Sequence, residues 1–199
     1  MDRRASILEA FAKCPVMPSL RRAEQLALVA SSPCRVVLVS SGSIFDICDY
    51  TEKLHQQGKM VLVHVDLISG LGRDAAGIKF LKEKAKAEGI VSPQCSLVTA
   101  ARKEGLVAVH RVFAYDSVSL ETGMRVLQQS KADLVEILPG AVIGTAVRIL
   151  RQHFDQPVIA GGLIRTREEV ADAIKAGAVA VDTSAESLWS GEWQYLSGR

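Results

Sequence analysis

The chain alternates, from one end to the other, between short aliphatic runs and longer segments whose apolar positions recur every three to four residues. The first pattern predicts buried strands and the second predicts amphipathic helices. Runs this rich in valine, leucine and isoleucine are typical of parallel strands covered on both faces. Eight strands are predicted, two of them weak (near Val16 and Ile90) and six clear ones that start near Val36, Val61, Val107, Leu134, Val158 and Val179.

Helical patterns fill the intervals between these strands. Thr166 and Glu169 form a capping box that begins one helix, and Ser43 and Asp46 form another. Gly58 is placed to end the helix that Ser43 begins. The predicted helices cover residues 4–13, 21–30, 43–57, 74–88, 94–104 and 144–153, with two more that begin near Ser117 and Thr166.

A strand followed by a helix, repeated eight times, predicts a small (β/α)8 TIM barrel in which residues 1–199 form a single domain. The alternative is a doubly wound open sheet, which would require the two weak strands to be misread. The helical segment 4–13 is too short to be stable alone, and we expect it to cover the N-terminal end of the barrel. Residues 190–199 match no pattern and are expected to form a mobile tail.

Composition narrows the classes of function. The chain is 48% hydrophobic and only 5% aromatic, so aliphatic side chains must build the core. Its net charge of +2 is far from the basic composition of a protein that binds nucleic acid by charge alone. It has no RNP-type aromatic strand motif and no GXXG clamp, and its aromatic residues are scattered. The sequence therefore identifies no RNA-binding residues.

The cysteines and the N-terminus bear on the cellular compartment. Cys14, Cys34, Cys48 and Cys95 fall in no C-x-x-C pair and in no metal-ligand spacing, which predicts free thiols in a reducing cytosol. The N-terminus has no apolar signal core, and no run approaches transmembrane length. We therefore expect a cytoplasmic protein with no membrane partner.

Small residues follow the last two predicted strands. Gly161-Gly162 follows the strand near Val158, and Thr183-Ser184 follows the strand near Val179, with a short helix start at Ser184. In (β/α)8 barrels, these two loops form a recurrent phosphate site, because backbone N–H groups at a helix start bind anions. Every barrel needs tight turns, but the place of these turns predicts a small phosphate ester as the ligand.

Polar residues interrupt other predicted strands. His64 and Asp66 are two apart on the strand 60–66, so they should share one face, and Glu136 interrupts an apolar run. An ionised carboxylate is costly to bury without a partner. Glu136 should therefore face a ligand hydroxyl or form an internal pair with Arg111 or His64.

An enzyme is the alternative function. His64, Asp66 and Glu136 would suffice for acid/base or metal-assisted chemistry on a phosphorylated polyol or sugar. However, they have no recognisable metal spacing, so no metal is predicted. No lysine lies at the C-terminal end of a predicted strand, which disfavours a Schiff-base aldolase.

Five short stretches carry a family resemblance. They are Ser41-Gly42-Ser43-Ile44, His64-Val65-Asp66-Leu67-Ile68-Ser69-Gly70-Leu71, Arg111-Val112-Phe113-Ala114-Tyr115-Asp116-Ser117, Glu136-Ile137-Leu138-Pro139-Gly140 and Ala160-Gly161-Gly162-Leu163-Ile164. In combination they resemble the glycerol uptake operon antiterminator family, and the resemblance covers residues 10–189. It implies a bacterial cytoplasmic regulator, with no catalysis and no cofactor, that senses glycerol-3-phosphate and acts on the leader mRNA of glycerol-utilisation genes.

The resemblance also assigns roles to individual residues. It implies a phosphate site made of Gly161, Gly162, Thr183 and Ser184. Asp66 and Glu136 would accept the glycerol hydroxyls, Arg111 would neutralise charge or orient Glu136, and His64 would complete the site. The expected partners are glycerol-3-phosphate and a leader mRNA, and pairing of two barrels into a homodimer is left open.

Overall fold

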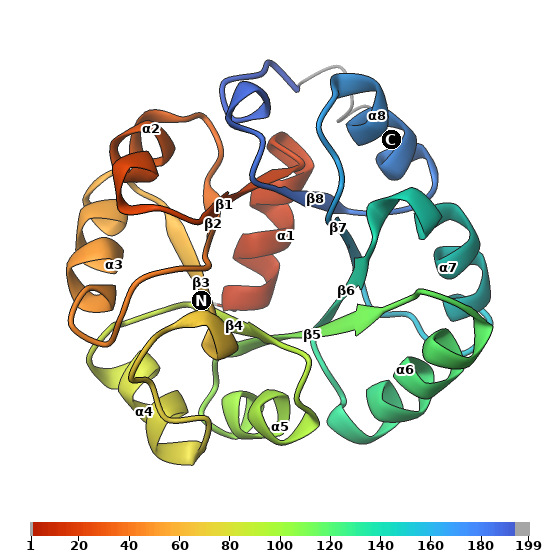
Figure 1. Cartoon of the computed structure of the whole chain (residues 1–199), viewed down its shortest axis with the longest axis horizontal. Coiled ribbons are helices and arrows are strands. Elements are labelled where there is room, and N and C mark those ends of the chain that lie inside the picture. The colour runs from red at the N-terminus through yellow and green to blue at the C-terminus, as the bar shows by residue number, and fades with distance from the viewer. Residues whose placement is uncertain (1, 194–199) are drawn as a thin grey trace.

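Eight parallel strands close into a barrel in the order in which they occur along the chain (Figure 1). The computed structural model describes residues 2–193. Because the last strand pairs with the first, the predicted (β/α)8 barrel is confirmed and the doubly wound open sheet is excluded. The strands are β1 (Val16–Leu20), β2 (Val36–Val39), β3 (Met60–His64), β4 (Gly89–Ser92), β5 (Val107–Phe113), β6 (Leu134–Leu138), β7 (Val158–Gly161) and β8 (Ala180–Thr183).

An α-helix on the outside of the barrel follows each of the first seven strands, and a single 3-10 turn follows β8 (Figure 1). The α-helices are α1 (Arg3–Lys13), α2 (Leu26–Ser31), α3 (Ile47–Gln56), α4 (Ala75–Glu83), α5 (Cys95–Lys103), α6 (Ser117–Ser130), α7 (Ile143–Leu150) and α8 (Arg167–Lys175). The 3-10 turns are η1 (Ala23–Gln25), η2 (Val65–Leu67), η3 (Gly140–Val142) and η4 (Glu186–Leu188).

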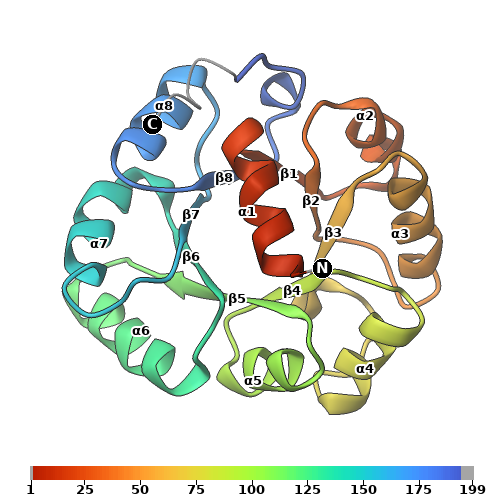
Figure 2. The ribbon, with the colours of Figure 1, turned by 180° about the vertical axis from the view of Figure 1, so that it is seen from behind.

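Two apolar clusters build the core. One lies between the strands and the outer helices and includes Val37 and Val63. The other fills the barrel at its N-terminal end, where Ile7 and Phe11 of α1 pack with Leu38 of β2. Helix α1 crosses that end of the barrel, as predicted (Figure 2). The functional cavity must therefore lie at the opposite, C-terminal end.

Two of the three helix-capping features predicted from the sequence form in the structure. Thr166 and Glu169 form the predicted capping box at the start of α8. Gly58 follows α3 with φ +69°, as expected of a residue that ends a helix. Ser43 and Asp46 do bond, the backbone N–H of Ser43 donating to Oδ2 of Asp46 at 2.8 Å. However, this bond closes a turn before α3, because the helix begins only at Ile47.

Several predicted element ends are wrong. Helix α4 ends at Glu83 rather than at residue 88, since Lys86 adopts φ +57° and the chain there turns inward to reach β4. Helix α7 ends at Leu150 rather than at residue 153. Strand β3 ends at His64, and the next three residues form η2. The short helix expected from Ser184 is only the three-residue turn η4.

The segment 190–199 was expected to form a mobile tail. Within it, Trp193 is buried, and the guanidinium of Arg167 lies 5.5 Å from the centre of its ring. Trp193 therefore packs against α8, while residues 194–199 of the predicted tail lie outside the described part of the chain. None of the helices within residues 2–193 has the length and the apolar character required to span a bilayer.

The four cysteines are free thiols, as predicted. Cys14 and Cys34 are buried, with their sulfur atoms 3.4 Å apart, and Cys48 and Cys95 are partly exposed.

Candidate functional site

A cavity of about 980 Å³ opens at the C-terminal end of the barrel. Its walls come from the ends of strands and the loops that follow them, the place where barrel enzymes and binding proteins hold their ligands. Polar groups reach it from four strands that lie far apart in the sequence. They are Ser19, Ser40, Arg111, Asp182, Thr183 and Ser184.

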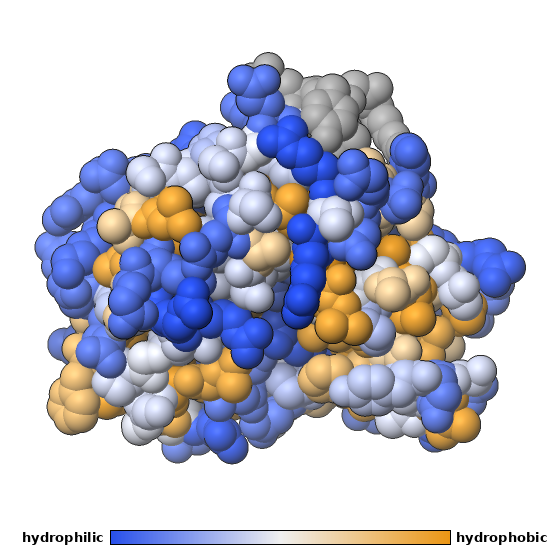
Figure 3. All heavy atoms as spheres, turned by 45° about the horizontal axis from the view of Figure 1, so that its top comes forward, coloured by the Kyte–Doolittle hydropathy of each residue, from blue (hydrophilic) through white to orange (hydrophobic). Residues whose placement is uncertain are grey.

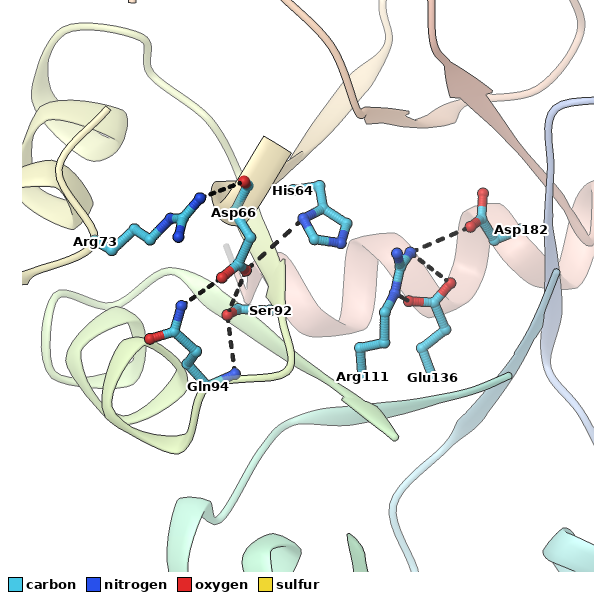
Figure 4. A network of polar contacts seen from close by, with 8 residues as sticks. All are labelled: His64, Asp66, Arg73, Ser92, Gln94, Arg111, Glu136 and Asp182. Atoms are coloured by element: carbon cyan, nitrogen blue, oxygen red, sulfur yellow. Dashed lines mark hydrogen bonds and ion pairs between the residues drawn. The ribbon is translucent and has the colours of Figure 1, made fainter. Parts of the chain in front are cut away.

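The centre of the site is an ion pair between two neighbouring strands. Arg111 on β5 and Glu136 on β6 are direct register partners. The Arg111 guanidinium donates from Nε to Oε2 of Glu136 at 2.7 Å and from Nη2 to Oε1 at 3.0 Å (Figure 4). Glu136 is fully buried, and it does not line the cavity. Of the two readings left open by the sequence, the internal pair with Arg111 is the one that forms.

Asp182 of β8 completes this centre, and sequence reasoning missed it as a site residue. Its Oδ2 lies 3.4 Å from Nη2 of Arg111, whereas its buried Oδ1 has no hydrogen-bond partner among the described residues. Burial and the nearby Glu136 carboxylate raise the pKa of Asp182 well above its usual range. Arg111 and Asp182 therefore lie side by side in the cavity wall, and Glu136 holds Arg111 from behind it.

His64 and Asp66 belong to a second polar cluster, beside β4 (Figure 4). Asp66 is not on strand β3 as expected but in the turn η2, because the pairing of β3 with β4 stops at His64, opposite Val91. Its carboxylate accepts hydrogen bonds from Ser92 Oγ at 2.8 Å and from the side-chain amide of Gln94. Asp66 does not line the cavity, so its predicted contact with a ligand hydroxyl stays a prediction.

His64 is a buried, neutral imidazole. Burial, helped by the positive charge of Arg111, lowers its pKa to about 4. Its Nδ1 lies 3.8 Å from Oδ2 of Asp66, beyond hydrogen-bond distance, and has no hydrogen-bond partner among residues 2–193. The two residues do come together as the sequence predicted, but a base with such a low pKa is poorly matched to proton transfer near neutral pH.

The two glycines after β7 have different roles. Gly161 is buried, and a Cβ atom there would lie only 2.6 Å from Oε1 of Glu136. This glycine therefore makes room for the carboxylate of the ion pair and does not itself line the cavity. Gly162 does line the cavity, and its φ of +76° is one that side chains with a Cβ rarely adopt. The predicted glycine turn thus has one supporting and one cavity-facing member.

The two residues after β8 also differ. The Thr183 hydroxyl donates to the carbonyl of Ile164 at 2.7 Å and accepts from the backbone N–H of Ala185 at 3.1 Å. It ties the loop after β7 to the loop after β8. The neighbouring Ser184 lines the cavity and is exposed, so its hydroxyl is available to a ligand. Both predicted residues lie at the cavity, next to Gly162.

Ser19 and Ser40 are further cavity residues that the sequence did not single out. Their hydroxyl oxygens lie 3.0 Å apart across the ends of β1 and β2. Ser19 lies near the end of β1, and Ser40 directly follows β2. This position relative to a short apolar strand is the only sequence feature that could have indicated them. Asp182 had a stronger signal, since it is a charged residue at the end of an apolar run.

Lysine side chains for covalent chemistry and clusters of metal ligands are the next groups to consider at this site. No lysine is among the residues that line the cavity within the described chain. Residues 2–193 contain no cluster of three His, Cys, Asp or Glu side chains arranged to hold a metal ion. The arrangement offers hydroxyl groups, one neutral acid and backbone turns, which suit the binding of a small polar anion.

A family model and similar solved structures point to the same protein family. The family model described as glycerol-3-phosphate responsive antiterminator matches residues 16–189. The protein YgcP of Escherichia coli (strain K12), which is described as uncharacterized, is 35% identical over 187 residues, which make up 92% of this chain and 96% of YgcP.

Two similar solved structures carry related names. The glycerol uptake operon antiterminator regulatory protein of Listeria monocytogenes is 29% identical with a TM-score of 0.85, over 89% of this chain and 96% of that one. A glycerol uptake operon antiterminator-related protein of Thermotoga maritima is 32% identical with a TM-score of 0.80, over 88% and 98% of the two chains. An aldolase named QR15, at 13% identity and a TM-score of 0.70, shares the fold alone.

Proposed function

The chain belongs to the glycerol-3-phosphate responsive antiterminator family, and on that premise we propose that it binds glycerol-3-phosphate and regulates transcription by binding leader mRNA. The effector occupies the cavity at the C-terminal end of the barrel. Its phosphate lies against Gly162 and Ser184, and its hydroxyl groups lie toward Arg111 and Asp182. The single observation that supports this most is the cavity, whose wall contains both the small residues Gly162 and Ser184 and the polar residues Arg111 and Asp182.

The neutral carboxyl of Asp182 suits an anionic ligand. A charged Asp182 would repel a phosphate dianion across the cavity, and the raised pKa of Asp182 favours its neutral, protonated form. In that form its buried, unpaired Oδ1 can exchange a hydrogen bond with a ligand hydroxyl. We assign this contact to Asp182, while Glu136 holds Arg111 in place from behind the cavity wall.

The same groups favour a regulator over an enzyme. The carboxylates of Glu136 and Asp66 are both held by hydrogen-bond donors of the protein. His64 is neutral and has a pKa of about 4, and no lysine lines the cavity within the described chain to form a Schiff base. We therefore propose binding without turnover and without a cofactor.

The proposal is tested by two measurements on the purified protein. Calorimetry with glycerol-3-phosphate should show binding that glycerol and inorganic phosphate alone do not match. Retention of the labelled leader transcript of a glycerol-utilisation operon should then rise when glycerol-3-phosphate is present. Equal RNA retention with and without the ligand would contradict the regulator. Loss of glycerol-3-phosphate during incubation would instead indicate an enzyme.

A further inference from the structure

Exposed apolar side chains gather at one end of the barrel. Among residues 2–193, seven large hydrophobic residues are exposed. Phe113 ends β5, and the others except Leu28 lie in loops after strands or in the first turn of the following helix. Phe45 is 91% exposed and Tyr115 is 75% exposed. Because these segments meet at the C-terminal end of a barrel, the apolar groups surround the mouth of the cavity. Exposed apolar groups gathered in one place mark an interaction surface.

Two aromatic members of this group, Phe113 and Tyr115, form a flat stacked pair. The rings of Phe113 and Tyr115 are stacked, with their centres 5.6 Å apart and their planes inclined by only 9°. Leu163, in the loop after β7, also lines the cavity; it is 70% exposed and adopts φ +63°, a conformation that costs a leucine about 1–2 kcal/mol. Two flat rings with exposed faces are suited to stacking against unpaired bases.

The charge of this end of the barrel is complementary to a polyanion. Arg21 and Arg165 line the cavity, and neither guanidinium forms an ion pair within residues 2–193. Four acidic side chains at this end accept hydrogen bonds from nearby backbone N–H groups, namely Asp46, Asp74, Asp116 and Glu169. A fifth, Glu186, is paired with Arg22 at 3.0 Å. Figure 3 shows the molecule tilted from the view of Figure 1, with hydrophobic side chains set among strongly hydrophilic ones.

We propose that the stacking face, defined by Phe45, Phe113, Tyr115, Arg21 and Arg165, is the surface that binds single-stranded RNA. Bases stack on the aromatic rings, and the two arginines bind phosphates of the RNA backbone. This inference rests on the proposed function, since it names the surface on which the leader mRNA is bound. It needs only a local basic patch, in agreement with the low net charge of +2.

The position of the stacking face explains how the ligand controls RNA binding. Phe113, Tyr115, Arg21 and Arg165 are at once members of this face and of the cavity wall. A ligand in the cavity therefore contacts the loops that present these side chains to RNA. Ordering of those loops by the ligand raises RNA affinity, and by thermodynamic linkage RNA raises the affinity for the ligand by the same factor.

Phe45 gives the sharpest test because it belongs to the stacking face but does not line the cavity. Fluorescence anisotropy of the labelled leader transcript, at saturating glycerol-3-phosphate, measures RNA affinity, and calorimetry measures ligand affinity. We expect Phe45→Ser and Tyr115→Ser each to weaken RNA binding about tenfold, whereas Tyr115→Phe keeps it. Phe45→Ser should leave ligand affinity unchanged. The matched control is Leu28→Ser, an exposed leucine on α2, which should behave as wild type.

The arginines give an independent readout. For single strands, each lost phosphate contact reduces the slope of log affinity against log salt by about 0.7. Arg21→Ala and Arg165→Ala should each show this reduction, and Arg4→Ala, on α1 at the other end of the barrel, should not.

The outcomes separate this inference from the function on which it rests. If the wild-type protein binds no leader RNA at all, the proposed function fails and this inference fails with it. If the wild type binds RNA and Phe45→Ser and Tyr115→Ser bind equally well, the stacking face is not the RNA surface, and the proposed function stands. If sedimentation shows that these variants only convert a dimer to a monomer, with RNA affinity unchanged, the face contacts a second copy and the inference is overturned.

Discussion

The two ends of the barrel are built from the same eight strands but hold opposite chemistry. At the N-terminal end, Ile7 and Phe11 of α1 lie across the strands and are almost completely buried. At the C-terminal end, the Arg111–Glu136 ion pair lies under an open cavity with exposed aromatic residues at its mouth. The difference indicates that one end supplies stability while the other is left open for binding, as in barrels generally.

The largest expected effect comes from opening the closed end. Phe11→Ala should lower the free energy of unfolding by about 4 kcal/mol, since it removes a buried ring and leaves a cavity. Urea denaturation followed by circular dichroism measures this change. Ligand affinity, measured by calorimetry at low temperature, should not change. Phe45→Ala is the matched control, because that ring is 91% exposed and its loss should alter stability little. A parallel loss of ligand affinity in Phe11→Ala would show that the two ends are not independent.

A somewhat smaller effect is expected when the ion pair at the open end is broken. Arg111→Met leaves the fully buried Glu136 without its partner and should cost about 3 kcal/mol of stability. Replacing both residues, in Arg111→Met/Glu136→Leu, should recover most of the stability but not ligand binding. If the double variant binds the ligand normally, the pair is only structural.

The third prediction is that His64, at the open end, makes stability fall as the pH is lowered. His64 has a folded pKa of about 4, below its ordinary value of about 6.5, so the unfolded chain binds more protons between these values. Its contribution is fully present above pH ~6.5 and is lost as the pH falls toward 4, by about 3 kcal/mol in total. Denaturation at a series of pH values should show this loss in the wild type and in the exposed control His153→Gln. A His64→Gln variant with an unchanged profile would contradict it.

The smallest effect on stability is expected from Asp182, as the pH rises above the pKa of this residue in the unfolded chain. Its folded pKa is raised by burial, so between the unfolded value near 4 and the folded one the native state binds more protons. Stability therefore falls as the pH rises through this range. Asp182→Asn, which mimics the neutral form, should remove this pH dependence and keep ligand affinity near neutral pH. Asp155→Asn, an exposed control, should keep the slope. Tenfold weaker ligand binding in Asp182→Asn would mean that the charged form is the one used.

Features that depend on a few neighbouring residues were predictable from the sequence. The capping box of Thr166 and Glu169 and the turn at Gly58 are local hydrogen-bond arrangements, and both formed as predicted. Asp66 shows where local reasoning fails. Its place in η2 depends on where β3 stops pairing with β4, a property of two strands and not of one.

The candidate site shows the same limit. Glu136 was recognised as a residue that needs a partner, but the register that places Arg111 beside it is a property of the closed barrel. Gly161 was assigned to a phosphate, whereas the structure uses it to make space for Glu136. Asp182, a charged residue directly after an apolar run, was not recognised as a site residue from the sequence. The aromatic residues are scattered along the chain, and only the loops after β2 and β5 bring them to one surface.

By itself, the sequence determined the alternation of strands and helices, the closed barrel, the family and the end of the barrel at which the cavity opens. These follow from periodic burial, from short-range hydrogen bonds and from motifs that are contiguous in the chain. Only the tertiary structure decided that Arg111 pairs with Glu136, that burial raises the pKa of Asp182, and that aromatic rings and arginines share the mouth of the cavity. Pairing register, desolvation and the approach of distant loops depend on the whole barrel, because each is set by residues that meet only when it closes.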